Sequence, residues 1–509
     1  MKLFDRVAKY FGYAKVAVRD FAGALSSRLT NDWLANITTA DSEIRSNIKT
    51  LRARCRELER NNDWVRRYFK LLENNVLGHC GVGLQMKIRE TVKVNGQFAE
   101  RYDKRANDLI EMAWEKWGRR EFCTIGQNLN WLDVQRIALR SVARDGCVLI
   151  RMHNPPDNPF RFALELIEAD QLDTDWSGKY GDNNVRLGVE YDANGRRVAY
   201  HILSEHPGDI FQRRADGMYR RRIPASEMIH LYMPERVGQS DGFPWLVSAM
   251  TGLRHLEKFT EAAVVNARMG AAKMGFITQD QNSPGYTGAP AAAGKYMEVE
   301  PGNIEVLPVG MKFEKFDPTY PSSDFAPFTK AALRQISSGL GVSYNSLSND
   351  LESVNYSSIR AGLLEEREEW KSVQSWFIQW FICRVFENWL RMSLTAGAIG
   401  DGNFSLPAQK FDKFNAPEFK PRRWPWVDPL SDLQADVLAV EKGFKSRREL
   451  ISERGGDIED VFSDIAADDA LAEQYDLDFD ADSGEQANQQ PDTPDAPDDP
   501  ESALTTPKD

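Results

Sequence analysis

The sequence predicts an α+β domain in its first half, a mainly helical second half and an acidic, disordered end. Strand signals are the apolar stretches 147–153 and 160–167 and a hairpin turn at Ala193-Asn194-Gly195. Apolar residues recur at three- and four-residue steps over 245–273 and 357–394, which is typical of helices. The α+β region is expected to cover residues 41 to about 235. Beyond Pro244 the strand signals give way to the helical pattern.

Size and charge limit the possible functions. The chain has 509 residues, enough for about three domains. It carries 64 Lys and Arg against 76 Asp and Glu, a net charge of −12. Residues 467–509 hold 11 Asp, 3 Glu and 1 Lys, so this segment carries −13 and the rest of the chain carries +1. A nearly neutral body is not expected to coat DNA, because tight non-specific binding requires a clear excess of positive charge.

Four helices are predicted in the first half. Residues 1–40 hold a weakly amphipathic arm, and 41–77 read as one long helix with Asp41 or Ser42 at its start. Helices are also expected over 97–118 and 131–144. Arginines of the 41–77 helix alternate with acids, which favours a solvated or intersubunit face over a phosphate-binding track; they are Arg52, Arg54, Arg56, Arg60, Arg66 and Arg67.

The second half is predicted to contain long helices separated by irregular segments. The helix over 245–273 is rich in small residues, which allow close packing against a neighbouring helix. Two strand-like pieces, MGFITQD and NIEVLPV, flank a Gly-, Ala- and Pro-rich segment at 280–302, and another helix is expected over 323–338. Aromatic residues on nearly every side of the 357–394 helix predict that it is buried. Two or three helices follow residue 424, and 467–509 is predicted to be disordered.

No catalytic or metal-binding signature is predicted. The five cysteines, Cys55, Cys80, Cys123, Cys147 and Cys383, are widely spaced and form no CxxC pair, which favours reduced thiols in a cytosolic protein. Charged residues interrupt the N-terminal segment, so no signal peptide is expected. Several carboxylates lie at the end of the predicted strand 160–167 and after it: Glu165, Glu168, Asp170, Asp173 and Asp175. A nuclease could hold magnesium with such a group, although acids in this position are more often solvated.

Four segments, in their order and spacing, resemble the portal proteins of tailed double-stranded-DNA bacteriophages, in particular the lambda-like branch. These segments are RARCRELERNNDWVRRYFKLLENNVLG, IPASEMIHLYMPERVGQSDGFPWLVSAM, SSGLGVSYNSLSNDLESVNYSSIRAGLLEEREEW and WPWVDPLSDLQADVLAVEKGFKSRRELISERGGDIEDVF. Together they cover roughly residues 45–465. The long acidic tail departs from the simpler members of the family.

The resemblance implies an α+β wing domain with long stem helices, a small clip subdomain and an α-helical C-terminal crown, arranged in a ring of copies. In chain order the implied parts are an N-terminal arm (1–40), the wing (41–244), a first stem helix (245–273), the clip (274–322), a second stem helix (323–338), a tunnel-loop region (339–356), a long wing or tunnel helix (357–400), the crown (401–466) and the acidic tail (467–509).

The implied function is a dodecameric ring at one capsid vertex, through which a terminase motor packages double-stranded DNA that later leaves by the same channel. The implied partners are other copies of the chain, DNA, the terminase large subunit, major capsid and scaffold proteins, and head–tail connector proteins. The implied location is the virion, and the host cytoplasm during assembly. No membrane, cofactor or metal ion is expected.

The resemblance also assigns residues to the channel, and the loop 345–356 is expected to be flexible. In the tunnel loop these residues are Asn345, Asn349, Asp350, Glu352, Asn355, Tyr356 and Arg360, and in the stem they are Arg268 and Lys273. The basic residues among them could equally form intersubunit ion pairs. Two other functions stay open: a different ring-forming head or tail adaptor, and a metal-dependent nucleic-acid-processing enzyme that uses the carboxylates named above.

Overall fold

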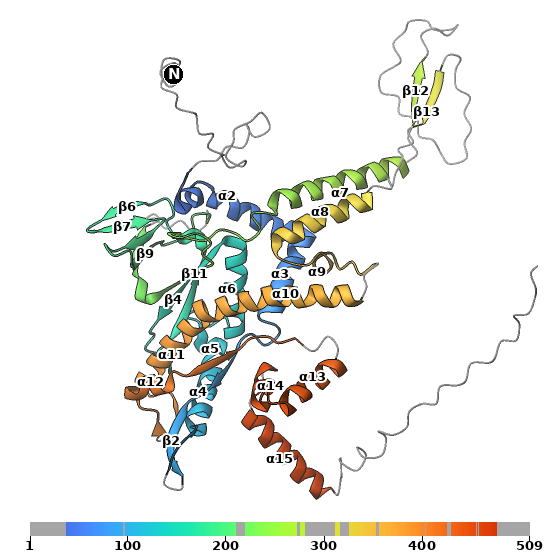
Figure 1. Cartoon of the computed structure of the whole chain (residues 1–509). Helices are drawn as coiled ribbons and strands as arrows, with labels where there is room; N and C mark the ends of the chain where they lie inside the picture. Colours follow the sequence, from blue (N-terminus) through green and yellow to red (C-terminus); the bar gives the residue numbers. More distant parts are fainter. Residues whose placement is uncertain are drawn as a thin grey trace, which may run out of the picture. The chain divides into compact units, whose positions relative to one another are not determined.

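The computed structural model divides the chain into two compact units. The first unit contains Met1–His79 and Asp108–Asn415, and the second contains Cys80–Asn107 and Ala416–Asp509 (Figure 1). The described residues are 37–94, 97–209, 219–271, 275–279, 311–315, 325–352, 356–402, 404–424, 429–454, 456 and 458–475. Most of the predicted N-terminal arm, residues 1–36, lies outside them. None of the described helices is long and apolar enough to cross a membrane.

The predicted helix over 41–77 is wrong as a single helix, because two helices cover this segment. They are α2 (Ala40–Asn61) and α3 (Asp63–Val76). Asn62 adopts an extended conformation between them, and its side-chain oxygen accepts a hydrogen bond from the Val65 backbone N–H at 3.2 Å. An asparagine in this position caps a new helix and ends the previous one. The N-cap of α2 is Thr39, not Asp41 or Ser42.

A three-stranded antiparallel sheet forms the centre of the first unit. Its strand order is β11-β4-β5, with β4 at Cys147–His153, β5 at Ala163–Ile167 and β11 at Met228–Tyr232. Helix α6 (Trp131–Asp145) leads into β4, which confirms the predicted helix and strand. Gly146 joins them with a φ of +89°, and an added Cβ there would lie 2.5 Å from the Phe243 backbone. Only glycine fits this left-handed, closely packed turn.

A second, five-stranded antiparallel sheet shares its core with the first. Its order is β10-β9-β8-β7-β6, with β6 at Gly178–Tyr180, β7 at Asn183–Arg186, β8 at Val189–Tyr191, β9 at Arg197–Leu203 and β10 at Arg220–Pro224. The predicted hairpin is confirmed, with Gly195 at a φ of +77° in its turn. Leu149 of β4 packs in one buried cluster with Val189, Tyr200 and Ile223. Short 3-10 helices lie at Ala169–Gln171 (η2) and Ala225–Glu227 (η3).

An aromatic core joins α6 to the end of the long C-terminal helix of this unit. The helix runs as α10 (Tyr356–Phe377), the π-helical segment η4 (Ile378–Ile382) and α11 (Cys383–Thr395), which confirms the prediction over 357–394. Trp389 is fully buried, and its ring lies 4.9 Å from that of Trp114. Burial is not complete, however, because Trp380 is 43% exposed. Shorter elements surround this core: α4 (Lys104–Trp117), α5 (Arg120–Cys123), β14 (Gly400–Asp401), β15 (Phe404–Ser405), η5 (Ala408–Lys410) and α12 (Phe411–Phe414).

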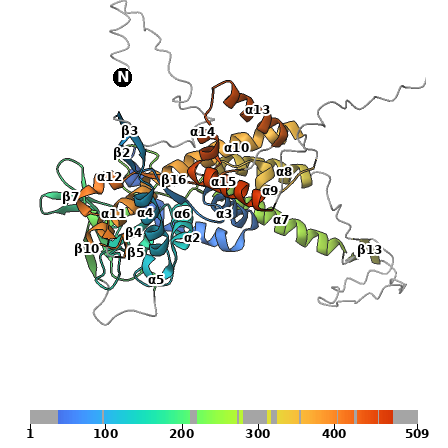
Figure 2. The same ribbon diagram turned by 90° about the horizontal axis from the view of Figure 1, so that it is seen from below.

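Two long helices, α7 (Met250–Ala271) and α8 (Phe325–Leu340), lie side by side (Figures 1 and 2). Leu253 and Leu256 of α7 and Ile336 of α8 are buried. Helix α7 begins five residues later than predicted, because residues 245–249 form turns in which the Trp245 N–H donates to the Ala143 carbonyl. Strand β12 (Gly275–Gln279) pairs with β13 (Met311–Lys315). The predicted strand NIEVLPV lies outside the described residues.

The second unit brings together segments that are far apart in the sequence. Strand β1 (Gly83–Met86) pairs with β16 (Pro417–Lys420), and β2 (Arg89–Val94) pairs with β3 (Gln97–Tyr102). The predicted helix over 97–118 is therefore wrong at its start, because Gln97–Tyr102 is a strand and α4 begins at Lys104. The intervening sequence Asn95-Gly96 is a strong hairpin signal.

Three helices complete the second unit: α13 (Pro429–Glu441), α14 (Arg447–Glu453) and α15 (Ile458–Gln474). The predicted disorder from residue 467 is wrong for its first residues, since α15 continues to Gln474. Alanines and a leucine between the acids of 466–474 favour the helix. Residues 476–509 lie outside the described residues.

Candidate functional site

The segment after α8 is folded back on that helix. Gly341 has a φ of +67°, and α9 (Tyr344–Ser348) begins directly afterwards, with the Ser343 hydroxyl accepting a hydrogen bond from the Ser346 backbone N–H at 3.2 Å. Asn349 then adopts a left-handed conformation with a φ of +56° and ends α9. Asparagine tolerates this conformation better than most residues, so it suits a tight helix end.

Asp350 holds this segment to α8. Its carboxylate lies 3.1 Å from the Lys330 ammonium group and accepts a hydrogen bond from the Tyr344 hydroxyl at 2.7 Å. The hydrogen bond from Tyr344 and the one from the Glu352 backbone, together with Lys330, lower the pKa of Asp350 to about 2. The carboxylate is therefore ionised at neutral pH, and it is occupied by partners from its own chain.

Helix α9 is also bound to α3 and α10. The Ser346 hydroxyl donates to Glu366 Oε2 at 2.8 Å, and the Ser346 carbonyl accepts from Arg67 Nε at 3.2 Å. Glu366 is buried, and its other oxygen accepts a hydrogen bond from the Trp370 indole at 3.3 Å. The prediction of a flexible loop over 345–356 is therefore wrong for residues 345–350, which form most of α9 and a tethered turn.

The structure separates the residues that were predicted to line a channel. Asn345 is half-buried in α9, whereas Asn349 and Glu352 are exposed and Asp350 is tethered. Tyr356 begins α10, and Arg360 lies one turn later in the same helix. Arg268 is exposed near the end of α7, while Asn355 and Lys273 lie outside the described residues. Asp350 and Glu352 are brought together by the hydrogen bond from the Glu352 N–H to Asp350 Oδ1 at 3.0 Å.

Sequence reasoning missed the residues that hold the segment in place. Lys330 and Arg334 of α8 each lie 5.6 Å from the centre of the Tyr344 ring. These two cations follow each other at a spacing of four, so they share one face of α8. The pattern Ser343-x-x-Ser346 was a local helix-start signal, but no sequence pattern linked Asp350 to Lys330, which is twenty residues earlier.

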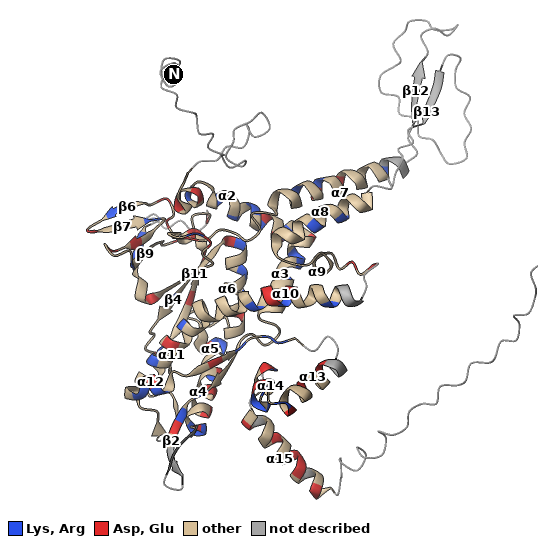
Figure 3. Ribbon diagram, in the orientation of Figure 1, with Lys and Arg blue, Asp and Glu red and all other residues tan. Residues whose placement is uncertain are grey.

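The exposed face of α7 carries charges that largely neutralise each other (Figure 3). Arg254 pairs with Glu257 at 3.2 Å, and Lys258 pairs with Glu261 at 2.7 Å. Both pairs are exposed, so they contribute little to stability. They do reduce the attraction of this helix for phosphate groups, because each cation already has an acidic neighbour.

A buried ionic cluster fixes the chain segment that leads into α7. Arg52 of α2 is 1% exposed and donates to the Asp145 carbonyl at 2.8 Å and to Asp241 Oδ2 at 2.9 Å. Arg56 pairs with the side chains of Asp145 and Asp170. The predicted solvated or intersubunit face is therefore wrong for Arg52 and Arg56. Four other arginines of this segment are exposed, as predicted: Arg54, Arg60, Arg66 and Arg67.

Comparisons with known proteins identify the family. A model of the phage portal protein, lambda family, matches residues 26–374. A probable portal protein of Halomonas phage phiHAP-1 is 34% identical over 458 residues, which cover 88% of this chain and 86% of that protein. The chain belongs to the lambda family of phage portal proteins. Portal protein B of Escherichia phage lambda is 21% identical over 479 residues, covering 87% of this chain and 86% of that protein.

The chain also resembles a solved structure of the virion of a native gene transfer agent particle. The sequence identity is 14% and the TM-score is 0.40, and the match covers 83% of this chain and 95% of that chain.

Portal proteins are structural proteins, and the carboxylates considered for a nuclease fit that role. Each of them already has a cationic or histidine partner in its own unit: Glu165 with His153, Glu168 with His206, Asp170 with Arg56, Asp173 with Arg220 and Asp175 with Lys49. A magnesium site needs carboxylate oxygens that converge on one cation. Glu168 and Asp170 do lie beside the same histidine, His206, and the donor atoms of these three residues lie within 4.8 Å of one another, but Asp170 is also held by Arg56 at 2.5 Å. The other three carboxylates pair with separate side chains, so the five do not converge on one cation.

Cys147, His230 and Asp241 form the most metal-like group among the described residues of the portal chain. Their donor atoms lie within 4.8 Å of one another, and all three residues are buried. Arg52 Nη2, however, lies 2.9 Å from Asp241 and 3.4 Å from Cys147 Sγ. Burial also raises the pKa of the Cys147 thiol well above its ordinary value, so the thiolate that metals prefer is disfavoured. These residues therefore fit a guanidinium and do not fit a metal ion.

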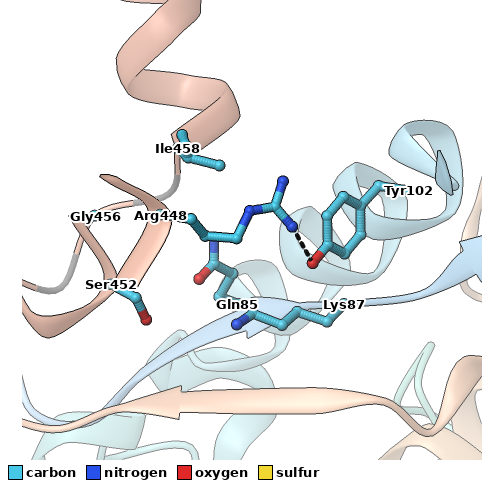
Figure 4. Close-up of a pocket in the computed structure, with 7 residues that line it drawn as sticks. All are labelled: Gln85, Lys87, Tyr102, Arg448, Ser452, Gly456 and Ile458. Carbon is cyan, nitrogen blue, oxygen red and sulfur yellow. Dashed lines mark hydrogen bonds between the residues drawn. The ribbon is translucent and has the colours of Figure 1, made fainter. Parts of the chain in front are cut away.

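A small pocket lies within the second unit of the portal chain (Figure 4). The Arg448 guanidinium donates to the Tyr102 hydroxyl at 2.9 Å across it, and Lys87 is paired with Glu418 at 2.6 Å. Because both cations already have partners, the pocket is a polar contact between α14 and the strands. It has little free positive charge with which to bind an anionic ligand. Its lining residues are Gln85, Lys87, Tyr102, Arg448, Ser452, Gly456 and Ile458.

Proposed function

We propose that this portal protein assembles as a closed ring of copies at one vertex of a viral head, and that double-stranded DNA enters and later leaves through the central channel. Membership of the lambda portal family supports this function. The observation that carries it is the α7–α8 pair, on which large apolar residues stay exposed although Phe259 and Phe328 contact each other with ring centres 4.8 Å apart: Phe259 (38%), Val264 (57%), Val265 (46%) and Phe328 (54%). Apolar surface of this kind is typical of protein–protein contacts.

The parts of the ring follow from the family resemblance. In this proposal α7 and α8 form the stem, and 274–322, which includes β12 and β13, forms the clip. The wing is 41–244, the tunnel-loop region is 339–356, and the crown is 401–466. The ring has twelve copies. A contact between unlike surfaces of neighbouring copies forms a closed ring when the rotation from one copy to the next is a whole-number fraction of a full turn.

The charge distribution supports passage of DNA without tight binding. The chain outside 467–509 carries a net charge of +1, and two exposed cations of α7, Arg254 and Lys258, are paired with acids. Each fixed phosphate contact would add a barrier to sliding, because affinity for DNA grows with every phosphate neutralised. Arg268 and Lys273 supply isolated weak contacts at most.

The partners are those of a packaging vertex. In this proposal the clip contacts the terminase large subunit during packaging and head–tail connector proteins afterwards, and the outer surface contacts major capsid and scaffold proteins. The protein would be found in the host cytoplasm during assembly and in the virion afterwards.

Averaged electron images of the purified full chain test the proposal. The expected result is closed rings with a central hole and a tapered stem. A monodisperse folded monomer at micromolar concentration, by analytical ultracentrifugation, would contradict ring formation. Rings without a tapered stem would instead favour a head or tail adaptor.

A further inference from the structure

The C-terminal helices of the second unit lack a core of their own. No described side chain of α13, α14 or α15 is buried. Large apolar residues are exposed throughout this segment: Leu433, Val437, Leu438, Phe444, Phe462, Ile465 and Tyr475. Exposed apolar surface on this scale indicates an interaction site, because helices without a buried face gain little stability alone.

Two surfaces of this segment have opposite charge (Figure 3). We call residues 442–448 the basic turn; it contains Lys442, Lys445, Arg447 and Arg448 and no acid. Helix α15 contains six acids and no Lys or Arg. Each surface also carries exposed aromatic or aliphatic side chains: Phe444 (84% exposed) in the basic turn, and Phe462 (48%) and Ile465 (49%) on α15.

Part of each charged surface is not neutralised within the described part of the chain. In the basic turn, Lys445 pairs with Glu453 at 2.9 Å and Arg448 donates to Tyr102. Lys442 and Arg447 are exposed and form no ion pair with a described residue. The same holds for Asp468 and Asp469 of α15. Both surfaces can therefore take an oppositely charged partner.

Helix α14 holds the basic turn in a defined position. Arg448 is anchored on Tyr102, with its guanidinium 5.0 Å from the ring centre (Figure 4). The Lys420 ammonium donates to the Ser452 hydroxyl at 2.9 Å. Phe444 lies three residues before this anchored helix, yet its side chain contacts the chain so little that 84% of it is exposed. Its partner is therefore to be sought outside its own subunit.

We propose that the basic turn of one copy docks on α15 of the next copy, with Phe444 against Phe462 and Ile465, and Lys442 and Arg447 facing Asp468 and Asp469, which lie three and four residues after Ile465 and so border the same face of the helix. A second copy fits this surface because one chain carries both complementary halves. The contact joins unlike surfaces, so it can repeat around a ring. The inference rests on the proposed ring and adds a specific contact between neighbouring copies.

Charge reversal on each surface separately, and then on both, tests this contact. The first variant is Lys442→Glu with Arg447→Glu, and the second is Asp468→Lys with Asp469→Lys. Ring assembly of the full chain is followed by mass photometry over a dilution series at low salt. We expect each variant to raise the concentration for half-assembly about tenfold, which corresponds to ~1.4 kcal/mol. The chain with all four substitutions, and an equimolar mixture of the two variants, should return to the wild-type concentration.

Two matched controls separate the contact from general charge effects and from misfolding. Lys179→Glu with Arg196→Glu reverses the same number of charges at exposed positions of the five-stranded sheet and should leave assembly unchanged. Phe444→Ser should weaken assembly about tenfold while the circular dichroism of the chain stays that of the wild type, because this side chain is exposed.

The outcomes distinguish the docking from the ring. Wild-type assembly by both charge-reversed variants would overturn the docking and leave the ring intact. Loss of assembly that the four-substitution chain does not restore would overturn it as well, since the two surfaces would then not face each other. A wild-type chain that forms no ring would contradict the proposed function itself.

Discussion

Apolar side chains around Trp389 are buried within one chain, whereas those of α13–α15 are exposed. Trp389 lies within 4.9 to 6.3 Å, between ring centres, of Trp114, Phe386, Trp117 and Phe160. In contrast, Phe444 is 84% exposed, and no described residue of α13–α15 is buried. The stability of the first region is thus a property of the single chain. If the proposed docking is correct, contacts with other copies cover the second region.

The charged residues show the same difference. Around Arg52, charges are buried and each is matched within the chain, so the cluster fixes α2 against the segment before α7. On α15, acids follow one another without a basic residue. A buried pair strongly destabilises a protein when one partner is removed, while an exposed charge has little effect on the monomer. Substitutions in the two regions should therefore act on different measurements.

The largest effect on stability is expected for Trp389→Ala. The substitution leaves a cavity in the aromatic core and should lower the free energy of unfolding by about 4 kcal/mol. Trp380→Ala, in the same long helix, removes a side chain that is 43% exposed and should cost less than ~1.5 kcal/mol. Urea unfolding followed by tryptophan fluorescence checks both. Equal losses in the free energy of unfolding for the two variants would show that the core around Trp389 is not the main source of stability.

A somewhat smaller effect is expected for Arg52→Met, at about 3 kcal/mol. The methionine keeps the apolar stem but leaves the buried Asp241 carboxylate and the Asp145 carbonyl without this donor. Arg54→Met on the exposed side of the same helix is the matched control and should change stability by less than ~0.5 kcal/mol. Thermal unfolding of both variants gives the comparison. If the Arg52→Met chain unfolded at the wild-type temperature, the cluster would not fix α2.

Much of the first unit could be predicted from the sequence, because its signals are local. The turn at Ala193-Asn194-Gly195, and the helix that ends at Asp145-Gly146, are determined by residues within a few positions. Errors arose where a cap or turn interrupts a continuous pattern, as at Asn62, or where a hairpin precedes a helix, as at Gln97–Tyr102. In both cases a local signal was present: the capping pair Asn62-Asp63 and the turn pair Asn95-Gly96. Each was weaker than the helical periodicity of the residues around it.

The contacts of the candidate site could not be predicted in the same way. Asp350 pairs with Lys330, Ser346 with Glu366, and Arg52 with Asp241, at separations of 20, 20 and 189 residues. A charge in a sequence looks the same whether it ends in solvent or in a buried pair. For that reason Arg52 was expected on a solvated or intersubunit face, and the segment around Asp350 was expected to be flexible.

Acidification should weaken the first unit through its buried histidines. Burial lowers the pKa of His230, so its imidazole stays neutral in the folded chain while an unfolded histidine binds a proton below about pH 6.5. Because the unfolded state then binds more protons, stability falls as the pH drops from 7 to 5.5, by up to ~1.4 kcal/mol per pH unit for this group. His230→Gln should reduce that slope, whereas His255→Gln, at an exposed position of α7, should leave it unchanged. Urea midpoints across this pH range provide the measurement, and identical slopes for all three chains would contradict the assignment.

The smallest effect on stability, and the most specific effect on function, is expected in the segment after α9. Asp350→Asn weakens the ion pair with Lys330 and should increase amide hydrogen exchange in α9 without changing ring assembly. Glu352→Lys alters a neighbouring exposed residue, two positions later, and leaves the Asp350 carboxylate in place. If this segment faces the channel, as we propose, a ring of such lysines attracts phosphates and should slow DNA packaging in a motor assay, more strongly at low salt. Packaging at the wild-type rate by Glu352→Lys rings at low salt would place the segment away from DNA. Slowing by Asp350→Asn alone would instead indicate that order in α9, and not charge in the channel, limits the passage of DNA.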